Sequence, residues 1–181
     1  GALTEEQQQA VDVMGRGVSE LERLVGDLIQ FATGSRGEMV LRPAAVSVRD
    51  LLERLVAAHR DRAAAQGVSL DCRLPGPEVT ALADGEKLRC VLDQLLDNAI
   101  KYTPAGGRVE AGASRSSDRV RFWVADTGPG IAADRLPELF EPFHQLDGSS
   151  TRRRGGTGLG LALVKMIVSA HQSAVSVETE P

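Results

Sequence analysis

Three groups of polar or glycine-rich residues in this sequence have types and spacings that could do chemistry. The first lies in segment 88–101, where Gln94, Asn98 and Lys101 recur at intervals of four and three beside an apolar face. In a helix this spacing places the two amides and the ammonium group on one stripe. Such a stripe could hold a cation and the phosphates around it. The same pattern is also typical of a solvated helix surface.

The second group is Asp126 with the turn that follows it, Thr127-Gly128-Pro129-Gly130. Apolar residues alternate along the expected strand 119–125, and the same alternation puts Asp126 on the apolar side. A carboxylate in that position is costly unless something donates hydrogen bonds to it. An ionised carboxylate only accepts, so Asp126 could receive the exocyclic amine of an adenine. The alternative is an aspartate that caps a tight turn.

The third group is the run Gly155-Gly156-Thr157-Gly158-Leu159-Gly160, which opens an apolar helix and follows a polar loop that ends in three arginines. Glycines allow close approach of the backbone, and the N–H groups of a helix start favour phosphate. The spacing fits neither a dinucleotide-binding turn nor a P-loop, because Leu161 stands where the P-loop lysine would be. A flexible surface loop before a glycine-rich helix start is the alternative.

The elements that position these groups mix helices with strands and a hairpin, which predicts an α+β fold. We expect a two-layer α/β sandwich, with a helical layer on a mixed sheet, preceded by a long N-terminal helix. Asp84 has the residue type and place of an N-cap. The expected helices are 4–32, 46–66, 84–102 and 158–171; the expected strands are 68–74, 108–113, 119–125 and 174–178, with a hairpin around 114–118 and a loop-rich stretch over 126–156.

The N-terminal helix carries apolar residues in alternating steps of three and four, which is the seam of a coiled coil or a helical bundle. An apolar stripe of this kind favours association with partner helices. An ordinary amphipathic helix that lies on its own domain is the alternative. The seam consists of Val11, Met14, Val18, Leu21, Val25 and Leu28.

Composition narrows the class of protein. The chain has 181 residues, 42% of them hydrophobic, which is enough for a core, and its net charge of −4 gives no electrostatic footprint for nucleic acid. Cys72 and Cys90 lack metal-ligand spacing, so we expect reduced, buried thiols. No apolar run is long enough for a bilayer and no signal-peptide pattern is present, so we expect a soluble, cytoplasmic chain, or the cytoplasmic part of a membrane sensor.

In this order, the segments resemble the ATP-binding domain shared by sensor histidine kinases, gyrase-type topoisomerases, heat-shock chaperones and mismatch-repair ATPases. The resemblance covers about residues 40–178. The phenylalanine box and the NAIKYTP ending are similar to the kinase branch. The matching motifs are DQLLDNAIKYTP (93–104), an asparagine box; DTGPGI (126–131), a first glycine box; LFEPFHQ (139–145), a phenylalanine box; and GGTGLGLALVK (155–165), a second glycine box.

The resemblance implies an ATP site with magnesium. Asp126 would accept the adenine amine, Asn98 would hold the ion, and Lys101 would contact phosphate. Phe140 and Phe143 would anchor the lid. The implied ATP-binding set is Asn98, Lys101, Tyr102, Asp126, Gly128, Gly130, Ile131, Thr157, Gly158, Leu159, Gly160 and Leu161, with Gly156 also lining the phosphates; the implied magnesium ligands are Asn98 and Gln94.

The resemblance also implies an organisation and partners. Residues 1–37 would be the second helix of a dimerisation hairpin with its linker, and residues 38–181 the catalytic domain. The implied partners are the histidine-bearing helix of the full-length kinase, the receiver domain of a response regulator, and a second copy in a homodimer. The module would donate the ATP γ-phosphate to a histidine outside this chain, and the phosphohistidine would then feed the regulator.

Three departures from the family pattern leave other functions open. The family phosphorylates a histidine on the first hairpin helix. None of the three histidines lies in such a helix, and we expect His59, His144 and His171 to be structural. Gln94 stands where the ATPase branch has a glutamate base, and an amide cannot take a proton from water. Gln172-Ser173 replace a usual glycine pair, and the sheet is expected to stop one strand early. The alternatives are a non-catalytic nucleotide-binding or dimerising module, and a stand-alone ATPase of the same superfamily.

Overall fold

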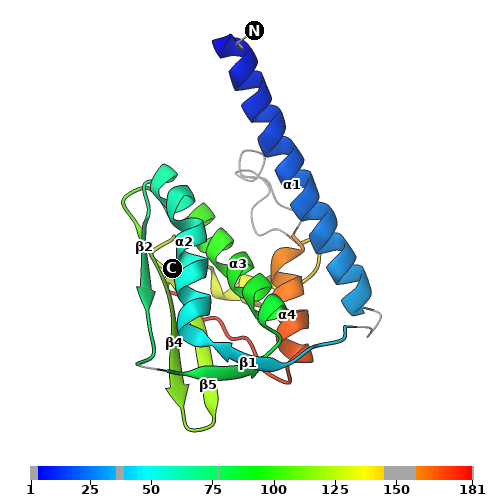
Figure 1. Ribbon diagram of the computed structural model, residues 1–181, viewed down its shortest axis with the longest axis vertical. Coiled ribbons are helices and arrows are strands. Elements are labelled where there is room, and N and C mark those ends of the chain that lie inside the picture. The colour runs from blue at the N-terminus through cyan, green and yellow to red at the C-terminus, as the bar shows by residue number, and fades with distance from the viewer. Residues whose placement is uncertain (1–3, 36–38, 77, 145–157, 181) are drawn as a thin grey trace.

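The computed structural model describes residues 4–35, 39–76, 78–144 and 158–180. It has the expected α+β class, with helices α2 and α3 covering one face of a sheet and the long helix α1 leading away from it (Figure 1). In chain order the elements are α1 (Glu5–Ser35), β1 (Ala44–Ser47), α2 (Val48–Ala65), β2 (Ser69–Arg73), β3 (Thr80–Ala83), α3 (Gly85–Tyr102), β4 (Arg108–Ser116), β5 (Arg119–Asp126), the 3₁₀ helix η1 (Ala133–Glu138) and α4 (Gly160–Ala170).

The main sheet is mixed, as the sequence predicts. Its strand order is β2-β4-β5, with β2 parallel to β4 and β4 antiparallel to β5. Ala113 lies opposite Phe122 and Val109 opposite Asp126, so the hairpin register carries Asp126 to the core-facing side. β1 and β3 form a separate two-stranded antiparallel sheet, which the sequence analysis did not predict.

Two element boundaries differ from the prediction for identifiable reasons. Helix α2 begins at Val48 rather than Val46, because the hydroxyl of Ser47 accepts the N–H of Asp50 at 3.3 Å and caps the helix. The expected strand 174–178 is wrong, since residues 174–180 form no strand in the described chain. This segment is held instead by a side chain, because the Thr179 hydroxyl accepts the N–H of Ile131 at 2.9 Å.

The larger core lies between the two helices and the sheet. Leu52 of α2, Leu96 and Ile100 of α3, and Val109 and Ala111 of β4 are fully buried. Val120, Phe122 and Val124 of β5 pack against this cluster, which confirms the alternation expected for that strand. Each Å² of apolar surface that is buried contributes about 25 cal/mol to the free energy of folding, so this cluster is the main source of stability for α3.

A smaller cluster joins α4 to α3. Leu163, Val164 and Ile167 of α4 pack against Val91 of α3, and all four are buried. α4 therefore lies beside α3, between it and the C-terminal part of α1 (Figure 1). This arrangement fixes the start of α4, where the glycine-rich run ends, next to the helix that carries Asn98.

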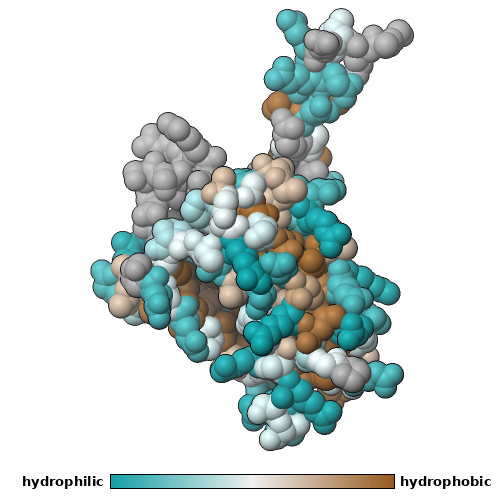
Figure 2. All heavy atoms as spheres, turned by 90° about the vertical axis from the view of Figure 1, so that its left-hand side faces the viewer, coloured by the Kyte–Doolittle hydropathy of each residue, from teal (hydrophilic) through white to brown (hydrophobic). Residues whose placement is uncertain are grey.

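The expected coiled-coil seam of α1 is largely exposed in the part of the chain that the structure describes. Its six residues have exposed fractions from 44% to 62%. The N-terminal part of α1 stands clear of the body in two perpendicular views (Figures 1 and 2). The helix contacts the domain through another face near its C-terminal end, where Asp27 is only 5% exposed. The seam is therefore available to a partner helix.

Two further expectations concern the state of the cysteines and the presence of a membrane-spanning helix. Cys72 and Cys90 are free thiols, as predicted. The expectation that both are buried is wrong for Cys72, which is exposed, and holds only in part for Cys90, which is half-buried. Among the described residues, no helix has both the length and the apolar composition that crossing a membrane requires.

Candidate functional site

Helix α3 is the central element of the candidate site, and its start is firmly held. The Asp84 carboxylate caps the helix by accepting the N–H of Lys87 at 3.1 Å, and it also accepts the N–H of Arg42 at 2.9 Å. Burial acts to raise the pKa of Asp84, but the backbone N–H groups of Arg42, Lys87 and Glu86 outweigh it and leave the pKa below its usual value. The predicted N-cap is confirmed.

The polar residues of α3 differ in their surroundings. Gln94 is buried at 8% exposure, Asn98 one turn later is half-buried, and Tyr102 is exposed. The ammonium of Lys101 lies 5.0 Å from the centre of the Tyr102 ring, within the range of a cation–π contact. The exposure of these side chains thus increases along α3, from the buried amide of Gln94 to the exposed ring of Tyr102.

Asp126 occupies the end of β5 in an open position. The expectation of a costly buried carboxylate is wrong, because Asp126 is the last residue of its strand and its side chain is exposed. Its Oδ1 accepts the N–H of Gly128 at 2.8 Å, so the capping interpretation holds in this structure. A carboxylate has lone pairs for further donors, so this contact leaves room for a ligand amine.

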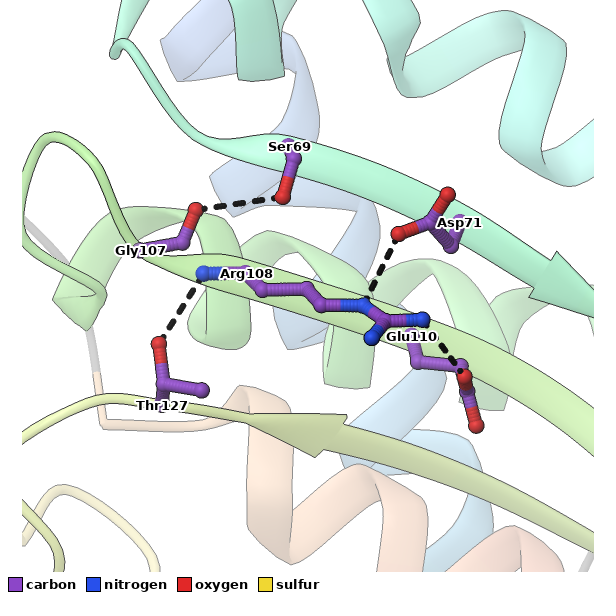
Figure 3. Close-up of polar contacts among 6 residues, drawn as sticks. All are labelled: Ser69, Asp71, Gly107, Arg108, Glu110 and Thr127. Carbon is purple, nitrogen blue, oxygen red and sulfur yellow. Dashed lines mark hydrogen bonds and ion pairs between the residues drawn. The ribbon is translucent and has the colours of Figure 1, made fainter.

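The loop after Asp126 is tied to strand β4 (Figure 3). The Thr127 hydroxyl accepts the N–H of Arg108 at 2.9 Å, and the Thr127 N–H donates to the Arg108 carbonyl oxygen at 3.0 Å. The Arg108 guanidinium in turn bridges Asp71 on β2 and Glu110 on β4, at 2.9 and 3.1 Å. Exposed ion pairs add little stability. The two hydrogen bonds between Thr127 and the Arg108 backbone fix the direction of the loop.

The same loop lies against the C-terminal end of α3. A Cβ added at Gly128 would come within 2.5 Å of Asp126 Oδ1 and within 3.7 Å of the Tyr102 carbonyl oxygen. The first distance is too short for a side chain unless the Asp126 carboxylate moves, whereas the second is an ordinary van der Waals contact with α3. The first glycine box and the asparagine-box helix therefore meet at Tyr102. Further along the loop, Gly130 has a φ of 69° and Ile131 is held by Thr179.

The described part of the second glycine box approaches α3 nearer its middle, at Gln94. Gly158 has a φ of 71°, and its carbonyl oxygen accepts the N–H of Phe143 at 3.1 Å. A Cβ at Gly160 would lie 2.4 Å from Gln94 Oε1. Leu159 is buried and Leu161 half-buried, so both support the start of α4. Gly156, Thr157, the arginines of the preceding loop and Gln145 lie outside the described residues.

Helix α1 adds residues that the sequence analysis did not assign to the site. The side-chain nitrogen of Gln94 donates to Asp27 Oδ1 at 3.0 Å, and both residues are buried. Beside this pair, the ammonium of Lys87 donates to Gln30 Oε1 at 3.0 Å. Phe31 meets Phe143 edge to face, with ring centres 6.2 Å apart. The apolar seam gives no signal for these contacts, because Asp27, Gln30 and Phe31 all lie outside it.

The histidines occupy structural positions away from Asp126. His171 Nε2 accepts the N–H of Asp84 at 3.1 Å, and its Nδ1 lies 2.9 Å from the Ile167 carbonyl oxygen, so the proton is on Nδ1. His144 lies 3.5 Å from Glu138. His59 lies 3.6 Å from an oxygen of Asp93, beside a cavity of about 440 Å³ that is also lined by Gln30, Lys87 and Gln94.

Comparison with known proteins identifies the family of this chain. Residues 83–181 match the family described as histidine kinase-, DNA gyrase B- and HSP90-like ATPases. The chain is 36% identical over 164 residues to the signal transduction histidine-protein kinase BaeS of Escherichia coli K12, covering 91% of this chain and 35% of BaeS.

Solved structures are similar over most of the chain. Full-length ShkA, crystallised in complex with AMPPNP, is 36% identical with a TM-score of 0.82, over 99% of this chain and 37% of that one. The histidine kinase AdeS of Acinetobacter baumannii is 26% identical with a TM-score of 0.72, over 94% of this chain and 76% of that one. The chain thus spans about a third of the length of BaeS and ShkA.

Proposed function

This chain belongs to the histidine kinase-, DNA gyrase B- and HSP90-like ATPase family, and on that premise we propose that it is the ATP-binding module of a two-component sensor histidine kinase. It binds Mg-ATP and donates the γ-phosphate to a histidine on another helix. Residues 1–37 are the dimerisation helix with its linker, and residues 38–181 are the catalytic domain. The module works in the cytoplasm, and a response-regulator receiver domain takes the phosphoryl group from the histidine.

The adenine end of the site is assigned to Asp126. Its carboxylate is exposed, anchored by the N–H of Gly128, and carried on a loop that two hydrogen bonds between Thr127 and the Arg108 backbone fix to β4. A carboxylate held in one place can accept the exocyclic amine of adenine, whereas guanine has an oxygen at the corresponding ring position and would be repelled. Tyr102, exposed beside this loop, packs against the nucleotide, with Gly128, Gly130 and Ile131 shaping the pocket.

The phosphate end is assigned to the start of α4. The helix begins at Gly160, and its N-cap Leu159 makes no side-chain capping bond. The first N–H groups of a helix have no partners within the helix, and together with the helix dipole they favour an anion. Lys101 and the backbone of residues 157–161 contact the phosphates. Gly158 and Gly160 stand at this start, and their missing side chains leave room for Phe143 and His144 beside Gly158 and for Gln94 beside Gly160.

The residues present fit magnesium. Among the described residues, no group of three or more histidine, cysteine or acidic side chains could hold a metal. Asn98 and Gln94 lie one helical turn apart on α3, and magnesium prefers oxygen ligands and keeps phosphate oxygens in its shell. The two amide oxygens would therefore hold the ion together with ATP. The bound ion neutralises charge on the phosphates, and the chain's own residues supply position.

The residue at position 94 is an amide and not a carboxylate base, which favours phosphoryl transfer over ATP hydrolysis. An amide does not take a proton from water, so Gln94 favours transfer to a histidine, which is itself a nucleophile. We expect slow ATP hydrolysis by the isolated chain. Rapid steady hydrolysis would favour a stand-alone ATPase instead, and ATP binding without any transfer to a separately supplied acceptor hairpin would favour a non-catalytic module.

The single observation that carries the proposal is the convergence on α3 of two segments far apart in sequence. The Asp126 loop meets α3 at Tyr102, and the start of α4 meets it at Gln94. These two contacts are eight residues apart, or about 12 Å along a helix. We therefore assign the amine acceptor to the Tyr102 end of α3 and the phosphate site to the Gln94 end.

The test is calorimetric titration of ATP into the chain and into Asp126→Asn. The amide keeps the shape but turns donors toward the adenine amine, so the affinity should fall by about 1–3 kcal/mol, or roughly five- to 150-fold. Asp118→Asn, which makes the same change in the exposed turn between β4 and β5, is the matched control and should bind as the parent does. Equal affinities in all three proteins would refute the adenine assignment.

A further inference from the structure

The buried pair between Asp27 and Gln94 connects helix α1 to the proposed metal site. Gln94 Nε2 donates to Asp27 Oδ1 at 3.0 Å, and the exposed fractions of the two residues are 8% and 5%. Buried polar groups of this kind are costly unless paired, so the contact restricts both side chains. Neither residue lies on the apolar seam of α1 or in the core of α3.

The pairing also decides which end of the Gln94 amide faces the site. An ionised carboxylate accepts hydrogen bonds and repels a carbonyl oxygen, so it selects the amide nitrogen. The oxygen Oε1 then points the other way, toward the start of α4, where a Cβ on Gly160 would lie 2.4 Å from it. Asn98 follows Gln94 by one turn on the same face of α3. Gln94 therefore presents an oxygen, and not a nitrogen, to the phosphate end of the site.

We infer that Asp27 is a positioning residue that holds the carbonyl oxygen of Gln94 toward the magnesium ion of bound Mg-ATP. The inference rests on the proposed function and adds to it a residue of the dimerisation helix. Asp27 does not itself touch the ion or the nucleotide. It acts as the hydrogen-bonded partner that fixes the orientation of a metal ligand, and loss of such a partner commonly lowers metal affinity by about tenfold or more.

A second contact explains why α1 can hold this position. Lys87 on the first turn of α3 donates to Gln30 Oε1, one turn after Asp27 on α1. Further along α1, Phe31 contacts the ring of Phe143. Three separate points of attachment fix both the rotation and the height of α1 on the domain. Asp27 therefore contacts Gln94 from a helix whose own position on the domain is fixed.

The test compares ATP affinity with and without magnesium in the chain, Asp27→Ala and Asp27→Asn. The measured quantity is the ratio of the Kd in excess chelator to the Kd in excess magnesium, by calorimetry. We expect Asp27→Ala to lower this ratio about tenfold with little change in the magnesium-free Kd. Asp27→Asn keeps an acceptor oxygen and should retain most of the ratio. Asp12→Ala, on the exposed part of α1, is the matched control and should leave it unchanged.

The outcomes separate this inference from the proposed function. A parent chain that binds no ATP under either condition would overturn both. A parent that binds Mg-ATP with the same ratio as Asp27→Ala would overturn the inference alone. Equal losses with and without magnesium would show a merely structural role, and tighter Mg-ATP binding by Asp27→Ala would show that Asp27 withholds Gln94. Each of these two results would also overturn the inference.

If Asp27→Ala folds poorly, hydrogen exchange of the Gln94 side chain tests the pairing directly. The side-chain NH₂ signals of Gln94 can be identified by their loss in Gln94→Ala. A buried hydrogen-bonded NH₂ group should exchange slowly with solvent in the parent chain. Its exchange should stay slow in Asp27→Asn. Fast exchange in the parent would overturn the pairing on which the inference stands.

Discussion

Replacement of Gly160 by alanine tests the packing between α3, α4 and α1 at one point. The added methyl group would lie 2.4 Å from Gln94 Oε1 and 3.2 Å from Cδ of the same side chain. A glutamine end can usually rotate away from such a contact at little cost. Here it cannot do so freely, because the Nε2 of Gln94 is bonded to the buried Asp27 at 3.0 Å. Accommodation of the methyl group must therefore break or distort that bond.

The magnitude follows from two opposing effects. Glycine to alanine within a helix stabilises by up to about 1 kcal/mol when the site is free. Loss of a hydrogen bond that leaves a buried polar group without its partner costs about 1–3 kcal/mol. The cost exceeds the gain, so we expect Gly160→Ala to lower the free energy of unfolding by about 1–2 kcal/mol. Gly17→Ala on α1, where the added Cβ meets nothing within 4 Å, should instead raise it.

The assay is urea unfolding followed by the fluorescence of Trp123, the single tryptophan of the chain. Gln94→Ala and the double variant with Gly160→Ala complete a cycle. Once the Gln94 amide is gone, the methyl group at position 160 meets no obstacle, so Gly160→Ala should cost nothing in that background. The coupling energy should be about 1–3 kcal/mol. An equal cost of Gly160→Ala in both backgrounds, or stabilisation of the parent, would refute the packing argument.

Three further changes have outcomes that the same unfolding assay measures. Leu96→Ala, at a fully buried position in the core beneath α3, should cost about 2–5 kcal/mol. Gly112→Ala should cost about 1–3 kcal/mol, because its methyl group would lie 2.4 Å from the Trp123 ring and 3.0 Å from the Arg73 carbonyl oxygen; a neutral result would contradict that geometry. Asp84→Asn keeps an N-cap but removes the charge of a carboxyl group whose pKa is lowered in the folded state. We expect a cost of about 0.5–1 kcal/mol in the free energy of unfolding. This cost should be fully present above roughly pH 4, the pKa in the unfolded state, and should disappear as the pH falls through the lower pKa of the folded state. A cost for Asp84→Asn that grows toward acid would reverse the sign of that pKa shift.

The elements that sequence reasoning located are those in which local pattern and tertiary packing agree. α3 has a capping residue, Asp84, and an apolar face that fills the main core, so its bounds of Gly85–Tyr102 match the expectation closely. The hairpin of β4 and β5 follows from the alternation of β5 and a short polar turn. In each case one segment carries its own signal of both type and orientation.

The elements that sequence reasoning missed depend on distant partners. β1 and β3 have four residues each, and they pair Ala44 with Ala83 across the whole of α2. Strands this short carry too little alternation to be distinguished from a helix start, which is how Val46 was assigned. The segment 174–178 has the opposite problem, since it alternates like a strand but forms none in the described chain. The alternation of apolar residues indicates a propensity to form a strand, but a strand forms only where a sheet edge is available to pair with it.

The role of α1 shows why part of the site is invisible to hydrophobic periodicity. The apolar seam of α1 dominates its pattern but remains exposed, whereas the face that docks includes Asp27 and Gln30. A polar contact of this kind depends on position more sharply than an apolar one, because hydrogen bonds weaken steeply with distance and angle. A shift of α1 by one residue would move Asp27 by about 1.5 Å along the helix and turn it by about 100°. The Gln94 amide would then lose its acceptor, so the docking of α1 admits one register, and any motion of this helix changes the orientation of a proposed metal ligand.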